Sequence, residues 1–429
     1  MSFNPTRRDV LVGGLGAGLA LPLTRTARLP RWLHALNQGD NILVVLQLRG
    51  GCDGLQCVAP IKDPVYQAAR VNFGIPADKG LLVDSNDSVY FHPSMADFKA
   101  LYDRGDLAIV QGIGYPNPNL SHFRSEDIWA TGDNAATTVN AGWLGTWRTT
   151  QYNGSFSIPM IDIEARRNDA FVGAAVPVFR SRSEFQFFVD TSTSAAGLDA
   201  VYEKALIEAN SKVARTTTEP NLTFVAKALD QTVSDMGLIQ MTGTSYTPKV
   251  TYPSTDATTT RLSSAFQLAA SYITGGMGTR VYYMDTGGFD THANEIASGN
   301  PVGGNMATLV QRFSSCIKAF LDDLKAYGKS SNVIVMVTSE FGRRLGQNGT
   351  NGTDHGQASL SYVAGEPVKG GLYGKYPDLS QYASRTDFNK ISLPFTTDFR
   401  SLYATVIDKW LGGDHTKVLP GTFPLLGML

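Results

Sequence analysis

The stretch that decides the fold runs from Asn332 to Arg344 and reads Asn-Val-Ile-Val-Met-Val-Thr-Ser-Glu-Phe-Gly-Arg-Arg. Its first half, Asn332–Val337, is a nearly unbroken apolar run. Such a run predicts a strand buried on both faces, as in a parallel sheet. In an open α/β sheet the ligand site lies just beyond the carboxyl ends of the strands. Glu340, which follows this strand, is therefore expected where functional side chains gather.

The same order of buried strand, glycines and acid occurs twice more. Ile42–Leu48 precedes a glycine turn that contains Asp53, and Arg280–Met284 precedes a glycine turn that contains Asp290 and His292. The carboxyl ends of parallel strands meet at one edge of a sheet. Three strand ends that deliver acids and histidines therefore predict one metal-binding active site.

Six residues are candidate metal ligands: Asp53, Asp290, His292, Glu340, Asp354 and His355. Carboxylates with a few imidazoles suit one or two divalent ions of Zn²⁺, Mn²⁺ or Mg²⁺. Taken singly, each residue also has a structural interpretation. Asp53 could cap its glycine turn, for example, and Glu340 could pair with Arg343. Their arrival at three strand ends favours the metal site.

Ser121 is the candidate nucleophile. The Pro and Asn content of residues 115–119 predicts a loop, and Ser121 is a natural N-cap for the helix behind it. A hydroxyl at a helix amino terminus faces free N–H groups and the positive end of the dipole. The simpler alternative is an N-cap without catalytic function. The candidate catalytic residues are Ser121, His122, Arg124 and Arg343, with the arginines as clamps for an anionic oxygen.

Composition and charge exclude several classes of protein. The chain has 429 residues, of which 42% are hydrophobic, and a formal net charge of −1. No global field would attract nucleic acid or an acidic membrane, so we expect no nucleic-acid partner. A P-loop, a Rossmann glycine fingerprint, zinc-finger spacing and Gly-x-Ser-x-Gly are all absent. Cys52 and Cys57 could form a local disulfide, although small buried residues are the favoured interpretation.

The amino terminus predicts export. Arg7 and Arg8 precede a short, weakly hydrophobic segment from Val12 to Leu23. This pattern is typical of a twin-arginine signal, and the segment is too short to span a membrane comfortably. We expect residues 1–38 to be a signal peptide and linker, and the mature protein to be periplasmic or secreted without a stable membrane span. A chance arginine pair before a buried helix is the alternative.

Residues 39–429 are expected to form one α/β domain with an insertion or cap at about 150–260. Residues 141–190 suggest mixed short strands. The other predicted elements are a strand at Leu107–Gly112 and helices at Ala96–Tyr102, Leu198–Ala209, Phe224–Met236, Leu262–Thr274, Met306–Tyr327 and Phe399–Leu411.

Several motifs together resemble the DUF1501 family of exported bacterial proteins, which is related to the alkaline phosphatase and sulfatase superfamily. The motifs are the initial Arg-Arg, Leu48–Leu55, Gly114–Ser125, Gly142–Gly145, Gly287–Ala293, Ser339–Arg343 and Gly352–Gly356. The resemblance implies a three-layer α/β/α sandwich with a mostly parallel sheet, two metals and a nucleophile at Ser121. It also implies that Asp53 is the first-strand metal acid. Asp290, His292 and His355 would hold one metal, and Glu340 the other.

By this resemblance the chain is expected to be an exported, metal-dependent hydrolase of phosphate or sulfate esters, acting on a small anionic ester. Phe341 stands where the superfamily has a histidine. That difference favours an alternative, namely a catalytically silent exported protein that binds a ligand or assembles with itself. A homo-oligomer remains open in either case.

Overall fold

The computed structural model describes residues 41–429 except 85–88, 134–138, 186–204, 206 and 214–215. The predicted export signal at residues 1–38 lies outside the described residues, as does most of the predicted helix Leu198–Ala209. Residues Asp40–Leu429 group into one unit by their contacts. The fold and the candidate site lie in the described part of that unit.

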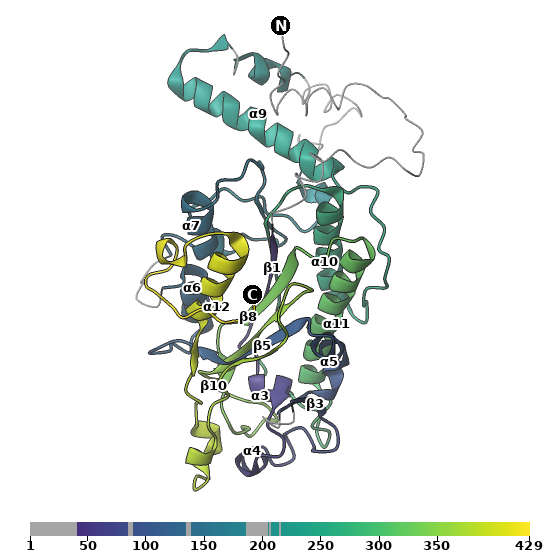
Figure 1. The fold of residues 1–429 in the computed structure, drawn as a ribbon, viewed down its shortest axis with the longest axis vertical. Helices are drawn as coiled ribbons and strands as arrows, with labels where there is room; N and C mark the ends of the chain where they lie inside the picture. The colour runs from purple at the N-terminus through teal and green to yellow at the C-terminus, as the bar shows by residue number, and fades with distance from the viewer. Residues whose placement is uncertain (1–40, 85–88, 134–138, 186–204, 206, 214–215) are drawn as a thin grey trace. The chain divides into compact units, whose positions relative to one another are not determined.

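A mostly parallel sheet forms the middle layer (Figure 1). Its order is β12 (Gly371–Gly374), β5 (Leu107–Gly114), β11 (Ser359–Ala364), β8 (Val333–Ser339), β1 (Ile42–Leu48), β7 (Val281–Thr286) and β6 (Met160–Asp162), and β13 (Thr397–Asp398) also pairs with β5. Strand β11 is antiparallel to both β5 and β8, whereas the other pairs of this sheet are parallel. All the other strands therefore end at the same edge.

Strand β1 is buried on both faces, as its apolar sequence predicts. Val44 and Leu46 belong to one hydrophobic core, and Leu43 and Val45 belong to the other. Successive side chains of a strand point to opposite faces of the sheet, so the two cores lie on its two sides.

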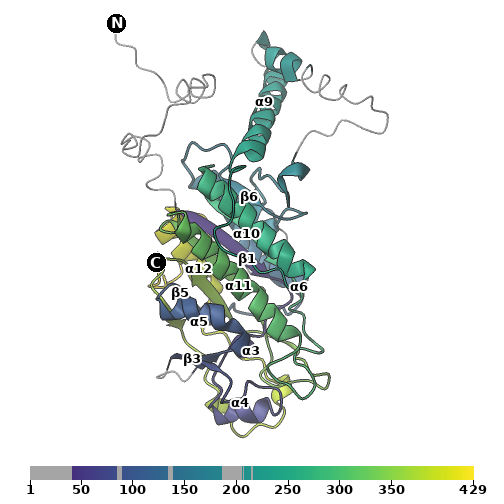
Figure 2. The ribbon, with the colours of Figure 1, turned by 90° about the vertical axis from the view of Figure 1, so that its right-hand side faces the viewer.

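Helices cover both faces (Figures 1 and 2). One core contains residues of α5 (Ala96–Asp103), α10 (Ala257–Gly275) and α11 (Asn305–Ala326). The other contains residues of α6 (His122–Thr131), α7 (Trp143–Thr150) and α12 (Phe399–Val406), which continues into a π-helical turn at Ile407–Leu411. The molecule is thus the predicted three-layer α/β/α sandwich.

Smaller elements complete the described chain. An antiparallel sheet has the order β2 (Val58–Ala59), β4 (Val89–Phe91) and β3 (Leu81–Asp84), and β9 (Gly342–Arg343) pairs with β10 (His355–Gly356). The remaining α-helices are α3 (Gly54–Cys57), α4 (Pro64–Ala69) and α9 (Pro220–Met241). Short 3-10 turns lie at Pro93–Met95, Asp169–Phe171, Arg182–Glu184, Ser380–Tyr382, Phe388–Lys390 and His415–Lys417.

One sequence-based expectation is only partly right. Residues 141–190 are expected to form mixed short strands, and β6 lies there, but Trp143–Thr150 is helix α7. Gly142 stands at its N-cap, and Trp143, Leu144 and Trp147 are buried with the helical spacing of one face. The predicted insertion at about 150–260 contributes the edge strand β6 to the central sheet, and it also contains α9.

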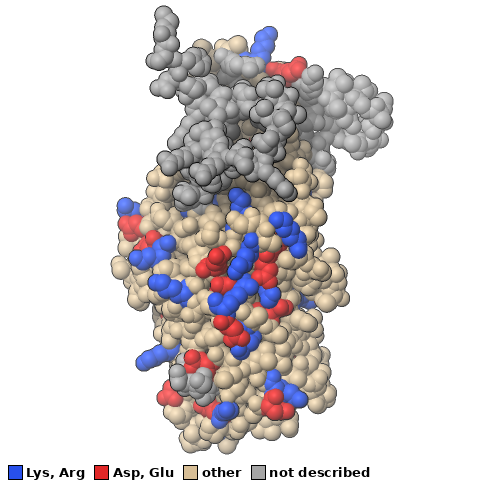
Figure 3. All heavy atoms as spheres, turned by 45° about the vertical axis from the view of Figure 1, so that its right-hand side comes forward, with Lys and Arg blue, Asp and Glu red and all other residues tan. Residues whose placement is uncertain are grey.

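The surface carries charges of both signs. Figure 3 shows acidic and basic side chains lying beside one another on one face of the molecule. No helix in the described part of the chain combines the length and the hydrophobicity that a bilayer crossing requires.

Candidate metal centre

The candidate centre lies beyond the carboxyl ends of β1, β5, β7 and β8. Strand β5 leads to His122, the first residue of α6, and β7 leads to Asp290 and His292. Glu340 follows β8 directly, and His355 lies shortly before the antiparallel strand β11, which begins at this edge. The topology thereby brings residues from distant parts of the sequence together.

Three imidazole nitrogens converge on the carboxylate of Asp290. Its Oδ1 atom lies 3.2 Å from Nε2 of His292 and 3.2 Å from Nε2 of His355. The two Nε2 atoms of these histidines are 2.9 Å apart. Nε2 of His122 lies 3.5 Å from Oδ2 of Asp290. His122, Asp290 and His355 also form a group whose ligand atoms all lie within 4.8 Å of one another.

The other nitrogen of each histidine faces an oxygen. Nδ1 of His122 lies 2.8 Å from Oε1 of Glu340, and Nδ1 of His292 lies 3.1 Å from Oδ1 of Asp354. Nδ1 of His355 lies 2.7 Å from the carbonyl oxygen of Leu120. A neutral imidazole that donates from Nδ1 carries a lone pair on Nε2. With a cation bound, the three histidines could thus present their Nε2 lone pairs to it beside the carboxylate, whereas without a cation Nε2–H of His355 can donate to Oδ1 of Asp290.

These distances fit a divalent cation. Ligands bound at about 2.0–2.1 Å in a tetrahedron lie about 3.3 Å from one another, close to the distances that join Asp290 to the three histidines and His292 to His355. The group within 4.8 Å does not include His292, so a cation bound by all four residues would draw His122 and His292 closer together. Oxygen acceptors behind metal-binding histidines fix the tautomer that binds the metal. Nε2 of His122 is enclosed and makes no hydrogen bond to any described residue. A cation among these atoms would account for that enclosed nitrogen and for the two facing nitrogens of His292 and His355.

Charge at the centre differs from residue to residue. Burial acts to raise the pKa of Asp290, but hydrogen bonds from Arg343 and His355 bring it down to about 2, so the carboxylate is ionised. Burial lowers the pKa of His355, which favours the neutral imidazole that binds a metal. The hydrogen bond to Glu340 raises the pKa of His122. A cation at His122 would therefore have to displace a proton.

Arg343 holds the surrounding loops together. Its guanidinium is fully buried and donates to the carbonyl oxygens of Gly50, Gly51, Phe289 and Thr353. It also donates to Oδ1 of Asp290 at 2.8 Å. Every nitrogen of the side chain is thus bound to the protein, which suits a positioning residue more than the predicted clamp for substrate.

Glu340 and Asp354, predicted as metal ligands, lie behind the histidines. Oε1 of Glu340 also accepts from the backbone N–H of Gly50 at 2.7 Å, and its Oε2 accepts from the Ser339 hydroxyl at 3.1 Å. Because both oxygens are bound, Glu340 orients His122. Phe341 packs beside the centre, with its ring centroid 4.9 Å from that of His122 and 4.6 Å from that of His355.

The structure does not bring Asp53 into this group. Asp53 is buried and forms an ion pair with the buried Arg70, at 2.6 Å between Oδ2 and Nη1. Its Oδ1 accepts from the backbone N–H of Leu55, so it caps α3. The nearby Glu295 carboxyl accepts from the hydroxyls of Thr291 and Thr353. Its pKa is well above the usual range because of burial and the charge of Asp53.

The two other catalytic candidates lie at the start of α6. Ser121 is the exposed N-cap residue, and its hydroxyl makes no hydrogen bond to the described residues. It stands between Leu120, whose carbonyl oxygen faces His355, and His122. Arg124 is half-buried on the first turn of the helix.

Sequence reasoning included His122 among the catalytic residues but not among the metal ligands. The signal was present, because β5 is a fourth buried strand whose carboxyl end leads into a turn and then to a histidine. Of the six predicted ligands, Asp290, His292 and His355 come together, Glu340 and Asp354 lie behind them, and Asp53 is elsewhere.

Comparison with curated proteins gave no match. Among solved structures, the chain is similar to Ps i-CgsB, with 10% identity, a TM-score of 0.38 and coverage of 89% of this chain and 75% of that chain. It is also similar to a sulfatase from Pseudoalteromonas sp., with 12% identity, a TM-score of 0.34 and coverage of 84% and 70%. A phosphonate monoester hydrolase from Silicibacter pomeroyi gives 12% identity, a TM-score of 0.34 and coverage of 88% and 74%.

These scores are too low to transfer an activity. A family model, by contrast, matches residues 180–423, which is more than half of the chain and includes Asp290, His292, Glu340 and His355. The chain therefore belongs to the family described as protein of unknown function DUF1501.

Proposed function

We propose that this protein is a hydrolase of phosphate or sulfate esters that holds one divalent cation through His122, Asp290, His292 and His355. The observation that carries the proposal is the convergence of three Nε2 atoms on one ionised carboxylate, with each Nδ1 bound to an oxygen. Three imidazoles and one carboxylate suit Zn²⁺ or Mn²⁺ better than Mg²⁺, which prefers oxygen ligands.

The residues around the centre supply the remaining chemistry. A bound cation that accepted a further ligand beyond the four residues would lower the pKa of a coordinated hydroxyl and polarise the ester oxygen. Ser121, with an unbound hydroxyl beside His122, would be the nucleophile. The amino terminus of α6 would stabilise negative charge that develops there. Arg124, on the first turn of this helix, would hold the anionic group.

One ion fits the surroundings better than two. Phe341 places an apolar ring against His122 and His355 at the position where the resemblance implied a further histidine. Asp53, expected as the first-strand metal acid, forms an ion pair with Arg70 instead. Neither residue is thus available to a second cation.

Elemental analysis of the purified protein tests the metal. We expect close to one equivalent of Zn or Mn, and its loss in Asp290→Asn and His355→Ala. His415→Ala is the matched control, because His415 pairs with Asp408 outside the centre and should not affect metal content. Absence of metal from the unaltered protein, or equal loss in all three variants, would refute the proposal.

Turnover tests the nucleophile separately. The metal-loaded protein should hydrolyse 4-nitrophenyl phosphate or 4-nitrophenyl sulfate, and Ser121→Ala should lower kcat by at least about 100-fold while it retains the metal. Ser264→Ala, which removes an exposed helical hydroxyl elsewhere, serves as the control. Unchanged turnover in Ser121→Ala would eliminate Ser121 as the nucleophile.

The packing of Phe341 also favours a second candidate function. An apolar ring against two of the histidines is consistent with a scaffold that has lost catalysis and retains binding or self-assembly. Bound metal without turnover of either ester would support this alternative.

A further inference from the structure

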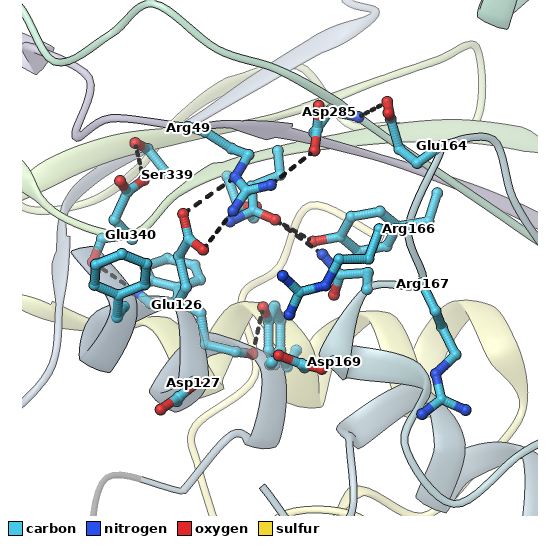
Figure 4. Close-up of a pocket in the computed structure, with 18 residues that line it drawn as sticks. Arg49, Glu126, Asp127, Glu164, Arg166, Arg167, Asp169, Asp285, Ser339 and Glu340 are labelled. Carbon is cyan, nitrogen blue, oxygen red and sulfur yellow. Dashed lines mark hydrogen bonds and ion pairs between the residues drawn. The ribbon is translucent and has the colours of Figure 1, made fainter. Parts of the chain in front are cut away.

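A polar pocket lies beside the metal centre, among the ends of β1, β7 and β8, helix α6 and the loop after β6 (Figure 4). The residues that line it are Gln47, Arg49, Phe123, Glu126, Asp127, Trp129, Ala130, Glu164, Arg166, Arg167, Asn168, Asp169, Tyr283, Asp285, Thr338, Ser339, Glu340 and Tyr403. Of these residues, only Glu340 forms a side-chain hydrogen bond to a proposed metal ligand, His122.

The pocket and the metal centre share a wall. Glu340 lines the pocket, and its carboxylate accepts from His122 in the centre. Phe123 and Glu126 follow His122 on α6, and the indole N–H of Trp129 on the same helix donates to the carbonyl oxygen of Glu340 at 2.8 Å. Glu340 thus separates His122 from the pocket, and the two sites adjoin at the exposed start of α6, where Phe123 follows His122 and lines the pocket.

Part of the charge in the pocket is paired within its walls. Arg49 lies between Glu126 and Asp285, at 2.7 and 3.2 Å, while Arg167 points away from this group (Figure 4). Glu164 is bound by Arg261 at 2.8 Å from behind. The lining residues include six carboxylates and three arginines, so the pocket offers no excess of positive charge. A second anionic group on the substrate would meet more acid than base there.

The back wall is a fixed set of amide and phenol groups. The side-chain oxygen of Gln47 accepts from the Tyr283 hydroxyl at 2.8 Å and from the Asn168 amide at 3.1 Å. Gln47 is only 6% exposed, and its amide nitrogen donates to none of the described residues. This nitrogen is not among the fully enclosed atoms that lack a partner, so it can donate to water or to an acceptor group of a ligand in the pocket.

The pocket lining also contains an aromatic residue, Phe123. Phe123 is 84% exposed, which is the highest value among the large hydrophobic side chains of the described residues. It directly follows His122, and its ring lines the pocket. A flat apolar face next to paired hydrogen-bonding groups suits a ring that has hydroxyls on its edge and C–H groups on its face.

We propose that this pocket binds the uncharged, polyhydroxylated alcohol part of the ester, such as a neutral sugar ring. The inference rests on the proposed function, because the metal centre would hold the phosphate or sulfate group of the same substrate. Hydroxyls can donate to the carboxylates and accept from Gln47 and Arg49 at once. The substrate class is thus a phosphate or sulfate monoester of a neutral saccharide.

Saturation-transfer NMR tests binding without turnover. The neutral probes are glucose, galactose, N-acetylglucosamine and lactose, and the acidic probes are glucuronate and galacturonate, which carry a carboxylate and no phosphate or sulfate ester. We expect at least one neutral probe to bind, at least about tenfold more tightly than its acidic counterpart, because two ions of like charge repel one another at short range. Binding of no probe, or equal binding of the acidic probes, would overturn the inference.

Two variants locate the binding. Phe123→Ala should weaken binding of the neutral probe at least about fivefold, which is the range of a lost aromatic contact. Phe224→Ala, which removes a comparably exposed ring on α9, is the matched control and should bind normally. Glu126→Gln releases Arg49 from one partner, so it should strengthen binding of the acidic probes relative to the neutral ones. Equal effects of Phe123→Ala and Phe224→Ala would place the saccharide elsewhere.

The two proposals can fail independently. A protein that binds metal but no neutral saccharide would retain the hydrolase proposal and refute this one. A protein that binds a saccharide through Phe123 but holds no metal would refute the hydrolase and retain a saccharide-binding pocket.

Discussion

Gly51 shows how a single residue shapes the centre. It has φ of +73°, and a Cβ atom added to it would lie 2.3 Å from Cε2 of Phe341. Its carbonyl oxygen accepts from Nε of Arg343 at 2.7 Å. The turn after β1, the Phe341 ring and the Arg343 guanidinium are thus fitted to one another at this position.

Gly51→Ala should destabilise the fold more than Gly105→Ala does. Both positions have positive φ, so each substitution introduces backbone strain of about 1–2 kcal/mol. Only Gly51 is packed against another side chain, which adds about 1–3 kcal/mol of overpacking, whereas a Cβ at Gly105 meets nothing within 4 Å. Urea unfolding measures the difference. An equal loss of unfolding free energy in the two variants would show that the Phe341 ring moves away from the added methyl group without cost.

Asp354 is expected to orient His292 without binding the metal itself. Asp354→Ala removes the acceptor at Nδ1 of His292, and such a loss typically weakens metal affinity by about 10–100-fold. A competition titration measures the affinity, and close to one equivalent should still bind at saturation. Asp408→Ala, which removes the acceptor of His415, should leave the affinity unchanged. A stoichiometry that fell at saturating metal would make Asp354 a ligand.

The elements divide into those that local sequence determines and those that distant contacts determine. The predicted strand Ile42–Leu48 coincides with β1, and the predicted run Asn332–Val337 overlaps β8, because each is a continuous apolar run. Strand β11 was not predicted. Two of its residues, Ser359 and Ser361, are polar yet buried, and the strand exists through its pairing with β5 and β8. Such pairing is invisible in the local pattern.

The site follows the same division. The positions of Asp290 and Glu340 could be predicted from the sequence. Each residue follows a buried parallel strand, and the carboxyl ends of parallel strands meet at one edge of the sheet. Sequence could not show that Arg70, from the end of α4, would neutralise Asp53. Nor could it show that Glu340 would use both oxygens on protein donors, because those donors come from other loops.

The end of β6 carries a pH-dependent element. Burial, together with the charges of Glu164 and Asp285, raises the pKa of Asp162 from 3.8 to about 7. The folded state therefore holds a proton that the unfolded state releases at lower pH. The resulting contribution to stability is complete below about pH 4, declines as the pH rises to about 7, and is lost above that pH.

Asp162→Asn should remove this dependence. Compared with the unaltered protein, the variant should gain up to about 3 kcal/mol in unfolding free energy between pH 5 and pH 8. Urea unfolding at both values measures the gain, and Asp78→Asn, at an exposed carboxyl, is the control. A constant difference between Asp162→Asn and the unaltered protein at the two pH values would show that Asp162 ionises normally.

At the scale of the whole molecule, a cation at the centre would join loops next to three strands of the sheet. His122 follows β5, Asp290 and His292 follow β7, and His355 precedes β11, while Glu340 after β8 supports His122. A ligand that binds only the folded state stabilises that state by mass action.

Chelation should therefore lower the melting temperature. Free metal at 100 times its Kd stabilises a folded protein by about 2.7 kcal/mol, so EDTA should remove a stabilisation of that order. Differential scanning calorimetry with and without EDTA measures it. The control variant Asp290→Asn should have the same melting temperature with and without EDTA. If EDTA does not change the melting temperature of the unaltered protein, the fold is not stabilised by a bound cation.

The most direct test of the central claim is an anomalous-diffraction map from crystals grown with Zn²⁺ or Mn²⁺. We predict a single peak at about 2.0–2.2 Å from the Nε2 atoms of His122, His292 and His355 and from a carboxylate oxygen of Asp290. No peak at these four residues, or a peak beside Asp53 instead, would contradict the account.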